Sequence, residues 1–494
     1  MFLHKSTMDK LEEIYRTESF DCPQNKAKYF ALFAFGEAYS VRPGLSPESV
    51  PGTMYFAQAL DLNQIIQERP SMMHLETLLL LSLFSYFLNR RHSACVLAGN
   101  AMRLGLIIGL NHNIPDSQLI DPIEMEHRIR LWWTIYIFNH MWSSKMGLPL
   151  QISEDDIHIG MPSESDTGLT GIYNEQFTDT GFIIANITLA RIAGDIITQL
   201  YSRKKYRETF LQRVQGLLKA LKNWVQTLPE HLKLNSDPES NKRHVISLHL
   251  SFNQCVILTT RPTLLHSLDR LNNHGSSPAQ DNHKTHDSIS HAVLTLNEAC
   301  IHAARHSHSI ILEKWIHGSL PMFGYFHAQY LFSSAMILAI SSLMLKEGTS
   351  DQDSFETALR LLHGMKENGN LTAAEFYSHL EKIKICLDHH FGNSKDEPNG
   401  PAQPSSLYLS SSLLQGSVND TGATENYSGV SFDNIQALTG DGPSYTTEMA
   451  FLEPTMESFL AQSNLNLGFP HSVDSFMNDA DSIYTYITPN MLTE

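Results

Sequence analysis

Histidines and carboxylates are the residues of this chain whose spacing could support chemistry. His302 and His306 lie four residues apart in the segment IHAARHSHS, and His308 follows closely. A helix would place the first two on one face, where they could ligate a metal ion. Without a third well-placed ligand, a solvated helix face is the favoured interpretation. The adjacent carboxylates Asp155 and Asp156 could support acid–base chemistry, but their turn-like context favours a capping role.

Sequence motifs of the common enzyme classes are missing from the chain. We find no glycine-rich phosphate loop, no G-x-S-x-G, no H-E-x-x-H and no C-x-x-C. The cysteines lie far apart, at Cys22, Cys95, Cys255, Cys300 and Cys386. An odd, sparse set argues against a disulfide framework and favours a reducing compartment, cytosol or nucleus. We therefore predict no catalytic residues, no cofactor and no metal site in this chain, and a function other than an enzyme's.

Charge is distributed very unevenly along the 494 residues. From Asp396 to Glu494 there are 13 acidic residues and no Lys or Arg, so this part carries 13 of the 17 net negative charges. The remainder, with 35 basic and 39 acidic residues, is nearly balanced. This acidity disfavours non-specific attraction to DNA or to anionic lipid. The sequence thus predicts two parts, residues 1–391 as a packed body and residues 392–494 as a linker followed by an acidic tail.

The body must be helical, because its apolar residues recur at spacings of three and four and no alternating strands appear. Leu75–Leu88 is apolar nearly all round, which predicts a central helix with Ser71 as its N-cap. It would pair with a helix at Ser93–Leu110. Ile123–Met146 is the clearest helix, ended by Gly147 and Pro149. Further helices are predicted at about 177–202, 206–227, 243–259, 286–307, 322–346, 354–368 and 372–391.

Two apolar stretches, Leu75–Leu88 and Tyr330–Leu345, are the longest in the sequence. Both are shorter than the roughly 20 residues that span a bilayer, so we interpret them as buried helices and expect no membrane contact.

In the acidic tail, hydrophobic and acidic residues are interleaved. Two segments stand out, one around Phe459 and Leu460 and the other around Phe476 and Met477. This pattern is typical of disordered activation segments, in which negative charge keeps apolar side chains solvated until a coactivator groove captures them. The alternative interpretation is a disordered tail without such a function.

The run EMEHRIRLWWTIYIFNHMWSSKMGLPLQISEDDIHIGMP carries a recognisable pattern of Arg-x-Arg, an aromatic pair, a Gly-x-Pro turn and an acidic stretch ending in Pro. The residues that fit this pattern are Arg128, Arg130, Trp132, Trp133, Gly147, Pro149, Asp155, Asp156 and Pro162. The run resembles the fungal-specific transcription factor regulatory domain, the middle homology region of zinc binuclear cluster regulators, also called the xylanolytic transcriptional activator regulatory domain. Asn139 and His140 replace the family's usual aspartate–arginine pair, and Leu148 replaces an arginine.

Other segments also resemble the family, and they occur in the same order along the chain as in the family. The resemblance as a whole covers about residues 5–391. AGNAMRLGLIIGLNHN is similar to a family helix, and LTTRPTLL, with Arg261 and Pro262, resembles the family's Leu-x-x-Arg-Pro-x-Leu. The resemblance implies an all-α regulatory domain of packed antiparallel helix pairs. The acidic tail after it is expected to be disordered.

The resemblance also implies a function, that of a fungal transcription regulator in the nucleus. Its acidic tail would recruit a coactivator or the transcription machinery, and homo- or heterodimers are possible partners. Full-length family members bind zinc through a six-cysteine cluster and thereby bind DNA; this sequence supplies only Cys22 near its start. DNA binding is thus expected only if a missing N-terminal zinc cluster is supplied. The alternative is an adaptor or dominant-negative dimerisation partner that does not bind DNA itself.

Overall fold

The structure is a computed structural model. It describes residues 2–393, with gaps at 21, 41–49, 64–69, 116–117, 119, 165–174, 203, 236, 275–289 and 345–348, and then residues 446–448, 451 and 454–462.

Helices form the described part of the chain. They are α1 (His4–Thr17), α2 (Pro23–Ser40), α3 (Thr53–Leu62), α4 (Met72–Phe87), α5 (Arg91–Ile107), α6 (Pro122–Met146), α8 (Thr180–Leu200), α9 (Phe210–Thr227), α10 (Arg243–His274), α11 (His291–Ile316), α12 (Tyr325–Met344), α13 (Thr349–Glu367), α14 (Leu371–Asn393) and α17 (Pro454–Ala461). Within the described residues the only β pairing is an isolated bridge between His112 and His158. The predicted all-α class is therefore confirmed.

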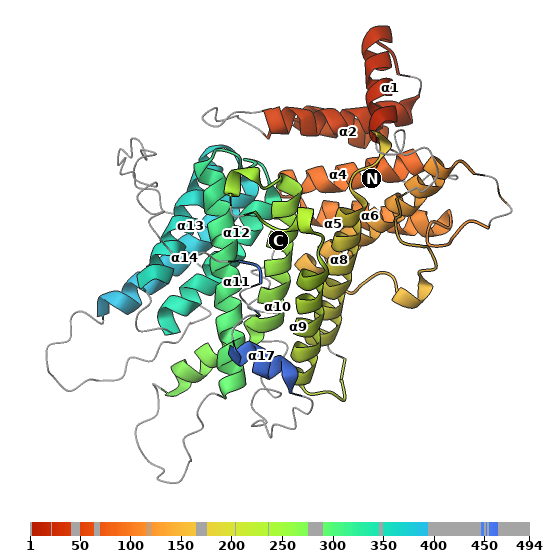
Figure 1. Cartoon of the computed structure of the whole chain (residues 1–494). Coiled ribbons are helices and arrows are strands. Elements are labelled where there is room, and N and C mark those ends of the chain that lie inside the picture. The colour runs from red at the N-terminus through yellow and green to blue at the C-terminus, as the bar shows by residue number, and fades with distance from the viewer. Residues whose placement is uncertain are drawn as a thin grey trace, which may run out of the picture.

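Two large hydrophobic cores organise these helices, with a smaller third cluster around Tyr86, Trp142 and Tyr325. In Figure 1, α2, α4 and α5 run across the view, whereas α8–α12 run from top to bottom. The first core is built mainly from α2–α6 and the second from α8–α14 together with α17. Helix α8 serves both, because Ile187 and Ala190 belong to the first core and Leu189 and Ala193 to the second. Alternate faces of α8 thus join the two halves of the body.

Local signals fixed several helix ends as predicted. Ser71 accepts a hydrogen bond from the amide of His74 at 3.2 Å and so caps α4, nearly all of whose side chains are buried. Helix α6 begins after Asp121, whose carboxylate accepts from the amide of Glu124 at 3.3 Å. It ends at Gly147, which has a φ of 64° and therefore takes the left-handed conformation that glycine tolerates best.

Two predicted helix ends are wrong. The sequence placed the end of one helix near residue 307, whereas α11 continues to Ile316. It placed the end of another near residue 259, ahead of Arg261 and Pro262, whereas α10 continues through Pro262 to His274. Proline removes one backbone donor inside a helix, and a partner from outside the helix must then satisfy the carbonyl left behind.

A buried ion cluster fixes α2, α4 and α6 to one another. The carboxylate of Glu76 on α4 accepts hydrogen bonds from Lys28 Nζ and His127 Nε2, both at 2.8 Å. Burial by itself would raise the pKa of Glu76, but the bonds and charges of His127 and Lys28 hold it below its usual value. The charged form of Glu76 is thus the one that the fold stabilises.

Helices α8 and α12 are long and apolar enough to cross a membrane by length and composition alone. In this structure both contribute to the second core, as the core helices of a packed bundle do.

Candidate functional site

The family-motif residues of α6 hold this helix to the segments that follow it. Arg130 is buried, and its guanidinium donates to Glu126 Oε1 at 2.7 Å, to the carbonyl of Thr178 at 2.6 Å and to Thr180 Oγ1 at 2.6 Å. Its guanidinium carbon also lies 4.7 Å from the centre of the Phe177 ring. Arg130 therefore joins α6 to the start of α8 through two hydrogen bonds and holds Glu126 of its own helix with a third.

The two adjacent tryptophans both pack in the first core, but only Trp133 has a described polar role. Its indole N–H donates to the carbonyl of Gly160 at 2.8 Å. Trp132 is fully buried, and its indole nitrogen has no hydrogen-bond partner among the described residues. The burial of both side chains thus gives this pair a role in core packing. Arg128 is half-buried, and burial lowers its pKa, an effect that Glu124 opposes.

The chain turns sharply after α6 and returns along it. Gly147 ends the helix, and Pro149 follows in the exposed turn. Ser153 Oγ then accepts from the amide of Asp155 at 3.4 Å, capping the short 3-10 helix Glu154–Asp156. The cap of this acidic stretch is thus supplied by the hydroxyl of Ser153. Pro162 is buried at the end of the return.

An ion pair crosses the bend between helices, although Asn139 and His140 replace the family's charged pair. Glu154 Oε2 accepts from Arg191 Nε at 2.8 Å, and its other oxygen accepts from the hydroxyl of Tyr136. His140 is buried against the Tyr136 ring, with the ring centres 3.8 Å apart. Burial lowers the pKa of His140 to about 4, so its ring is neutral at pH 7. A charge network therefore exists here, and it uses Glu154 and Arg191.

The Arg261–Pro262 pair lies within α10. Arg261 Nη2 donates to the hydroxyl oxygen of Tyr201 at 3.2 Å, and that hydroxyl donates to the carbonyl of Leu258 at 2.6 Å. The Arg261 guanidinium carbon is also 5.7 Å from the centre of the Tyr201 ring. Arg261 thus holds Tyr201, at the end of α8, against α10.

The apolar residues of the first acidic–hydrophobic segment are packed inside the protein. Residues 454–461 form α17, which lies against α9 and α11 (Figure 1). Phe459 is 2% and Leu460 6% exposed, and both belong to the second core together with Phe451 and Met456. The expectation that this segment is unpacked and solvated is therefore wrong. Phe476 and Met477, the other predicted coactivator contacts, lie outside the described residues.

Polar contacts hold α17 in register with the body. Gln215 on α9 donates from Nε2 to the carbonyls of Phe459 at 2.7 Å and Gln462 at 3.0 Å, two acceptors at the helix end. Lys222, two turns further along α9, lies 3.7 Å from the carboxylate of Glu457. No local pattern singles out Gln215 or Lys222, because their partners lie more than 200 residues away along the chain.

His249 on α10 fixes the chain just before α17. Its Nε2 donates to the carbonyl of Leu232 at 2.8 Å, so its Nδ1 accepts from the hydroxyl of Thr447 at 2.7 Å. Burial lowers the pKa of His249 and favours this neutral ring. The ring of Phe451 lies 6.1 Å from that of Phe252 on α10. The tail segment is thus anchored at several points.

The histidine cluster of α11 is largely buried, so the interpretation as a solvated helix face is wrong. Burial lowers the pKa of His302 to about 4, of His306 to about 3 and of His308 to about 4. The Nδ1 of His306 lies 3.1 Å from the amide nitrogen of Asn253 and accepts from it. Among the described residues, no group of three or more His, Cys, Asp and Glu side chains could hold a metal ion.

Comparison with known proteins gives one matching family and several relatives. Residues 6–226 match the model of the fungal specific transcription factor domain. A transcriptional regulatory protein of Schizosaccharomyces pombe is 27% identical over 381 residues, which cover 75% of this chain and 44% of the relative. Activator of stress genes 1 of Saccharomyces cerevisiae is 29% identical over 291 residues, 54% of this chain and 30% of that protein.

A third relative, the ABC-transporter-regulating transcription factor of Aspergillus oryzae, is 24% identical over 290 residues, 56% of this chain and 32% of its own. This chain therefore spans less than half the length of these curated relatives. No solved structure matches. The resemblance found in the sequence is confirmed.

Proposed function

We infer that this chain, which carries a fungal-specific transcription factor domain over residues 6–226, belongs to a regulator of transcription whose helical body holds its own acidic C-terminal segment. The relatives support the first part, since those described above are a transcriptional regulatory protein, an activator of stress genes and a transcription factor. Support for the second part comes from the position of α17.

The burial of Phe459 and Leu460 carries this proposal. Burying one such side chain stabilises the docked state by about 1.5–3 kcal/mol, and the two hydrogen bonds from Gln215 add to this. A coactivator groove would need to bury the same two side chains. The docked and the recruiting states therefore exclude each other, and release of α17 is the step that would license activation.

This mechanism is tested by loosening α17 without altering its sequence. We choose Gln215→Leu together with Lys222→Glu in the full chain, fused to a foreign DNA-binding domain that reads a reporter gene. The first substitution removes both hydrogen bonds, and the second opposes Glu457 with a like charge. We expect reporter expression to rise several-fold over the unaltered fusion. Lys219→Glu, at an exposed position of the same helix, is the matched control and should leave expression unchanged.

Hydrogen exchange supplies the physical measurement for the same variants. Amides of 454–461 should exchange faster in the double variant, whereas those of α4 should keep their protection. Faster exchange without a rise in expression would contradict recruitment through Phe459 and Leu460. That result would favour the alternative function, an adaptor or dominant-negative partner in which α17 is structural.

The remaining functional assignments are proposals that follow from family membership. We propose a nuclear location, coactivator or transcription machinery as the partner of the acidic tail, and pairing with a like regulator. Zinc and DNA binding belong to the proposal only for a protein that also carries the six-cysteine cluster.

A further inference from the structure

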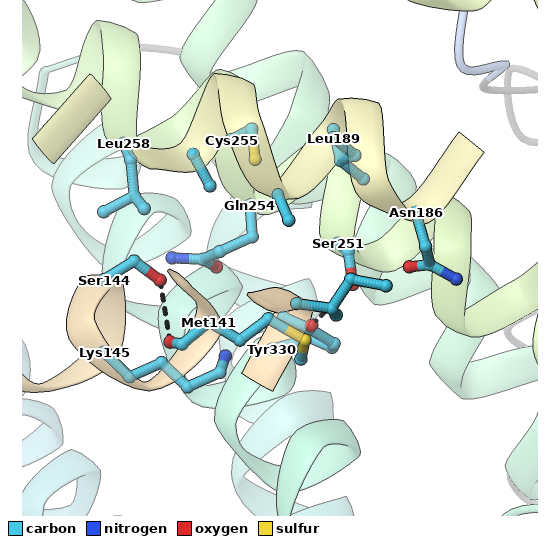
Figure 2. A pocket seen from close by; sticks show the side chains of 13 residues that line it. Met141, Ser144, Lys145, Asn186, Leu189, Ser251, Gln254, Cys255, Leu258 and Tyr330 are labelled. Carbon is cyan, nitrogen blue, oxygen red and sulfur yellow. Dashed lines mark hydrogen bonds between the residues drawn. The ribbon is translucent and has the colours of Figure 1, made fainter. Parts of the chain in front are cut away.

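A pocket at the junction of α6, α8, α10 and α12 contains a single charged group. The space inside it that water-sized molecules can occupy is about 40 Å³, which suits only a small ligand. Of the residues that line it, Lys145 alone is charged, and no Asp or Glu is among them. Figure 2 shows the side chain of Lys145 with its nitrogen beside Met141 and Tyr330. The pocket thus offers one ammonium group within a largely apolar wall.

Among the described residues, no carboxylate lies within ion-pair distance of Lys145. Instead, its nitrogen is 5.2 Å from the centre of the Phe326 ring and 4.9 Å from that of Tyr330. Cation–π contacts stabilise an ammonium group less than a buried carboxylate at hydrogen-bond distance does. Two buried cations, Lys28 and Arg130, do have carboxylate partners, Glu76 and Glu126 respectively. Lys145 differs from these two in having aromatic rings in that place.

Neighbouring side chains suit a ligand with one anionic end and an apolar body. The amide of Gln254 on α10 projects into the same space (Figure 2) and supplies a second donor. Leu189 and Leu258 form apolar wall on the sides contributed by α8 and α10. The hydroxyl of Tyr330 is already engaged, since it lies 2.8 Å from Ser251 Oγ, whose own proton goes to the carbonyl of Ser247.

We propose that this pocket binds a small organic carboxylate, with the carboxylate on Lys145 and the amide of Gln254 and the apolar end against Leu189 and Leu258. The site does not depend on the function proposed above for α17. Its ligand would contact four helices at once, and would therefore stabilise the junction between the two cores.

Binding of such an anion should depend on pH in a defined direction. Burial lowers the pKa of Lys145 to about 7 in the empty pocket. The groups that face it are Cys255 on α10, whose pKa burial raises to about 12, and the phenol of Tyr330 on α12, whose pKa burial also raises. Both are neutral near pH 7, and α8 contributes no titratable side chain to the lining. A carboxylate therefore binds best below pH 7, where Lys145 is already charged.

The test uses the full chain with sodium butyrate and its neutral analogue butyramide at equal ionic strength. Calorimetry at pH 6.0 should show butyrate binding about tenfold or more tightly than butyramide, as a charge-assisted bond predicts. At pH 8.5 this advantage should shrink about tenfold, because the amine must first take up a proton. Equal binding of the two compounds at pH 6.0 would overturn the proposal.

Lys145→Met keeps the length of the side chain and removes the charge, and should abolish the preference for butyrate over butyramide. Lys219→Met, at an exposed position on α9, should keep it; a preference that survives Lys145→Met contradicts the site. A measurement on the unaltered protein does not depend on how the variant folds. Reductive methylation at pH 7, followed by peptide mass spectrometry, should modify Lys145 and be slowed by butyrate; unslowed modification contradicts the proposal.

Discussion

The hydroxyl of Tyr201 donates to the carbonyl oxygen of Leu258, four residues before Pro262, at 2.6 Å. In a regular helix this carbonyl would accept from the amide of residue 262, but proline has no amide hydrogen. Tyr201 therefore supplies from α8 the donor that α10 lacks. This contact explains why α10 continues through the Arg261–Pro262 pair.

Tyr201→Phe should destabilise the protein. The substitution leaves the carbonyl of Leu258 buried without a donor, which lowers the free energy of unfolding by about 1–3 kcal/mol. Adding Pro262→Ala restores a backbone N–H and should recover part of this loss. Urea denaturation followed by circular dichroism measures both. Tyr206→Phe removes a hydroxyl that donates to Thr198 at an exposed site, and should change stability by less than about 0.5 kcal/mol. A Tyr201→Phe protein as stable as the parent would contradict this account.

Arg130→Lys should be poorly tolerated although it keeps the charge. A lysine ammonium cannot reach Glu126, Thr178 and Thr180 with the planar geometry that the guanidinium provides. We expect the free energy of unfolding to fall by about 2–4 kcal/mol, in the range for a disrupted buried ion pair. Denaturation in guanidinium chloride measures it. Arg16→Lys, whose partner Glu12 is exposed, should have almost no effect, and similar losses for the two variants would contradict a special role for Arg130.

Gly194 of α8 packs closely against His140 of α6. A β-carbon there would lie 2.7 Å from Cδ2 of the His140 ring, which is itself packed on Tyr136. Gly194→Ala should therefore lower the melting temperature, at a cost of about 1–3 kcal/mol. Gly216→Ala in α9 is the matched control, because nothing lies within 4 Å of its added carbon. There the better helix propensity of alanine should stabilise the protein by about 0.5–1 kcal/mol. Equal effects at the two sites would refute the close packing.

The buried histidines of α11 should make the protein sensitive to acid. Their pKa values in the folded protein, about 4 for His308 and about 3 for His306, lie below the unfolded value of 6.5. The unfolded chain thus binds more protons between these limits, and the free energy of unfolding falls as the pH is lowered from about 6.5 towards 4. His308→Gln should flatten this dependence by about one proton, whereas His363→Gln, on the exposed side of α13, should not. Urea denaturation at a series of pH values measures the slope, and a slope unchanged by His308→Gln would contradict the prediction.

Much of the helical architecture was predictable because its signals are local. The Ser71 cap, the Gly147 stop and the apolar periodicity each act within a few residues. The structure agrees with these predictions to within several residues at most ends. Recognising the motif also singled out Arg130 and Trp133, but it did not reveal what they bind. Thr178 and Gly160 become their partners only when the chain returns past α6.

Predictions failed where tertiary contacts outweigh local preference. Pro262 is a helix breaker by itself, yet Tyr201, about 60 residues earlier, makes it tolerable. The segment around Phe459 has the composition of a solvated tail, yet its apolar side chains are buried against α9 and α11. The histidines of α11 look polar in sequence, but their helix is covered on several sides. None of these outcomes is encoded within a short window of residues.

Helix α17 and the two helices that it contacts, α9 and α11, belong to one polypeptide. The effective concentration of α17 at this surface therefore does not change when the protein is diluted. A protein that competes for α17 must therefore overcome this high local concentration, and not only the intrinsic affinity of the contact. Lengthening the connection between residues 393 and 446 would lower that local concentration without altering any contact described above, so the threshold for release can be set by chain length alone.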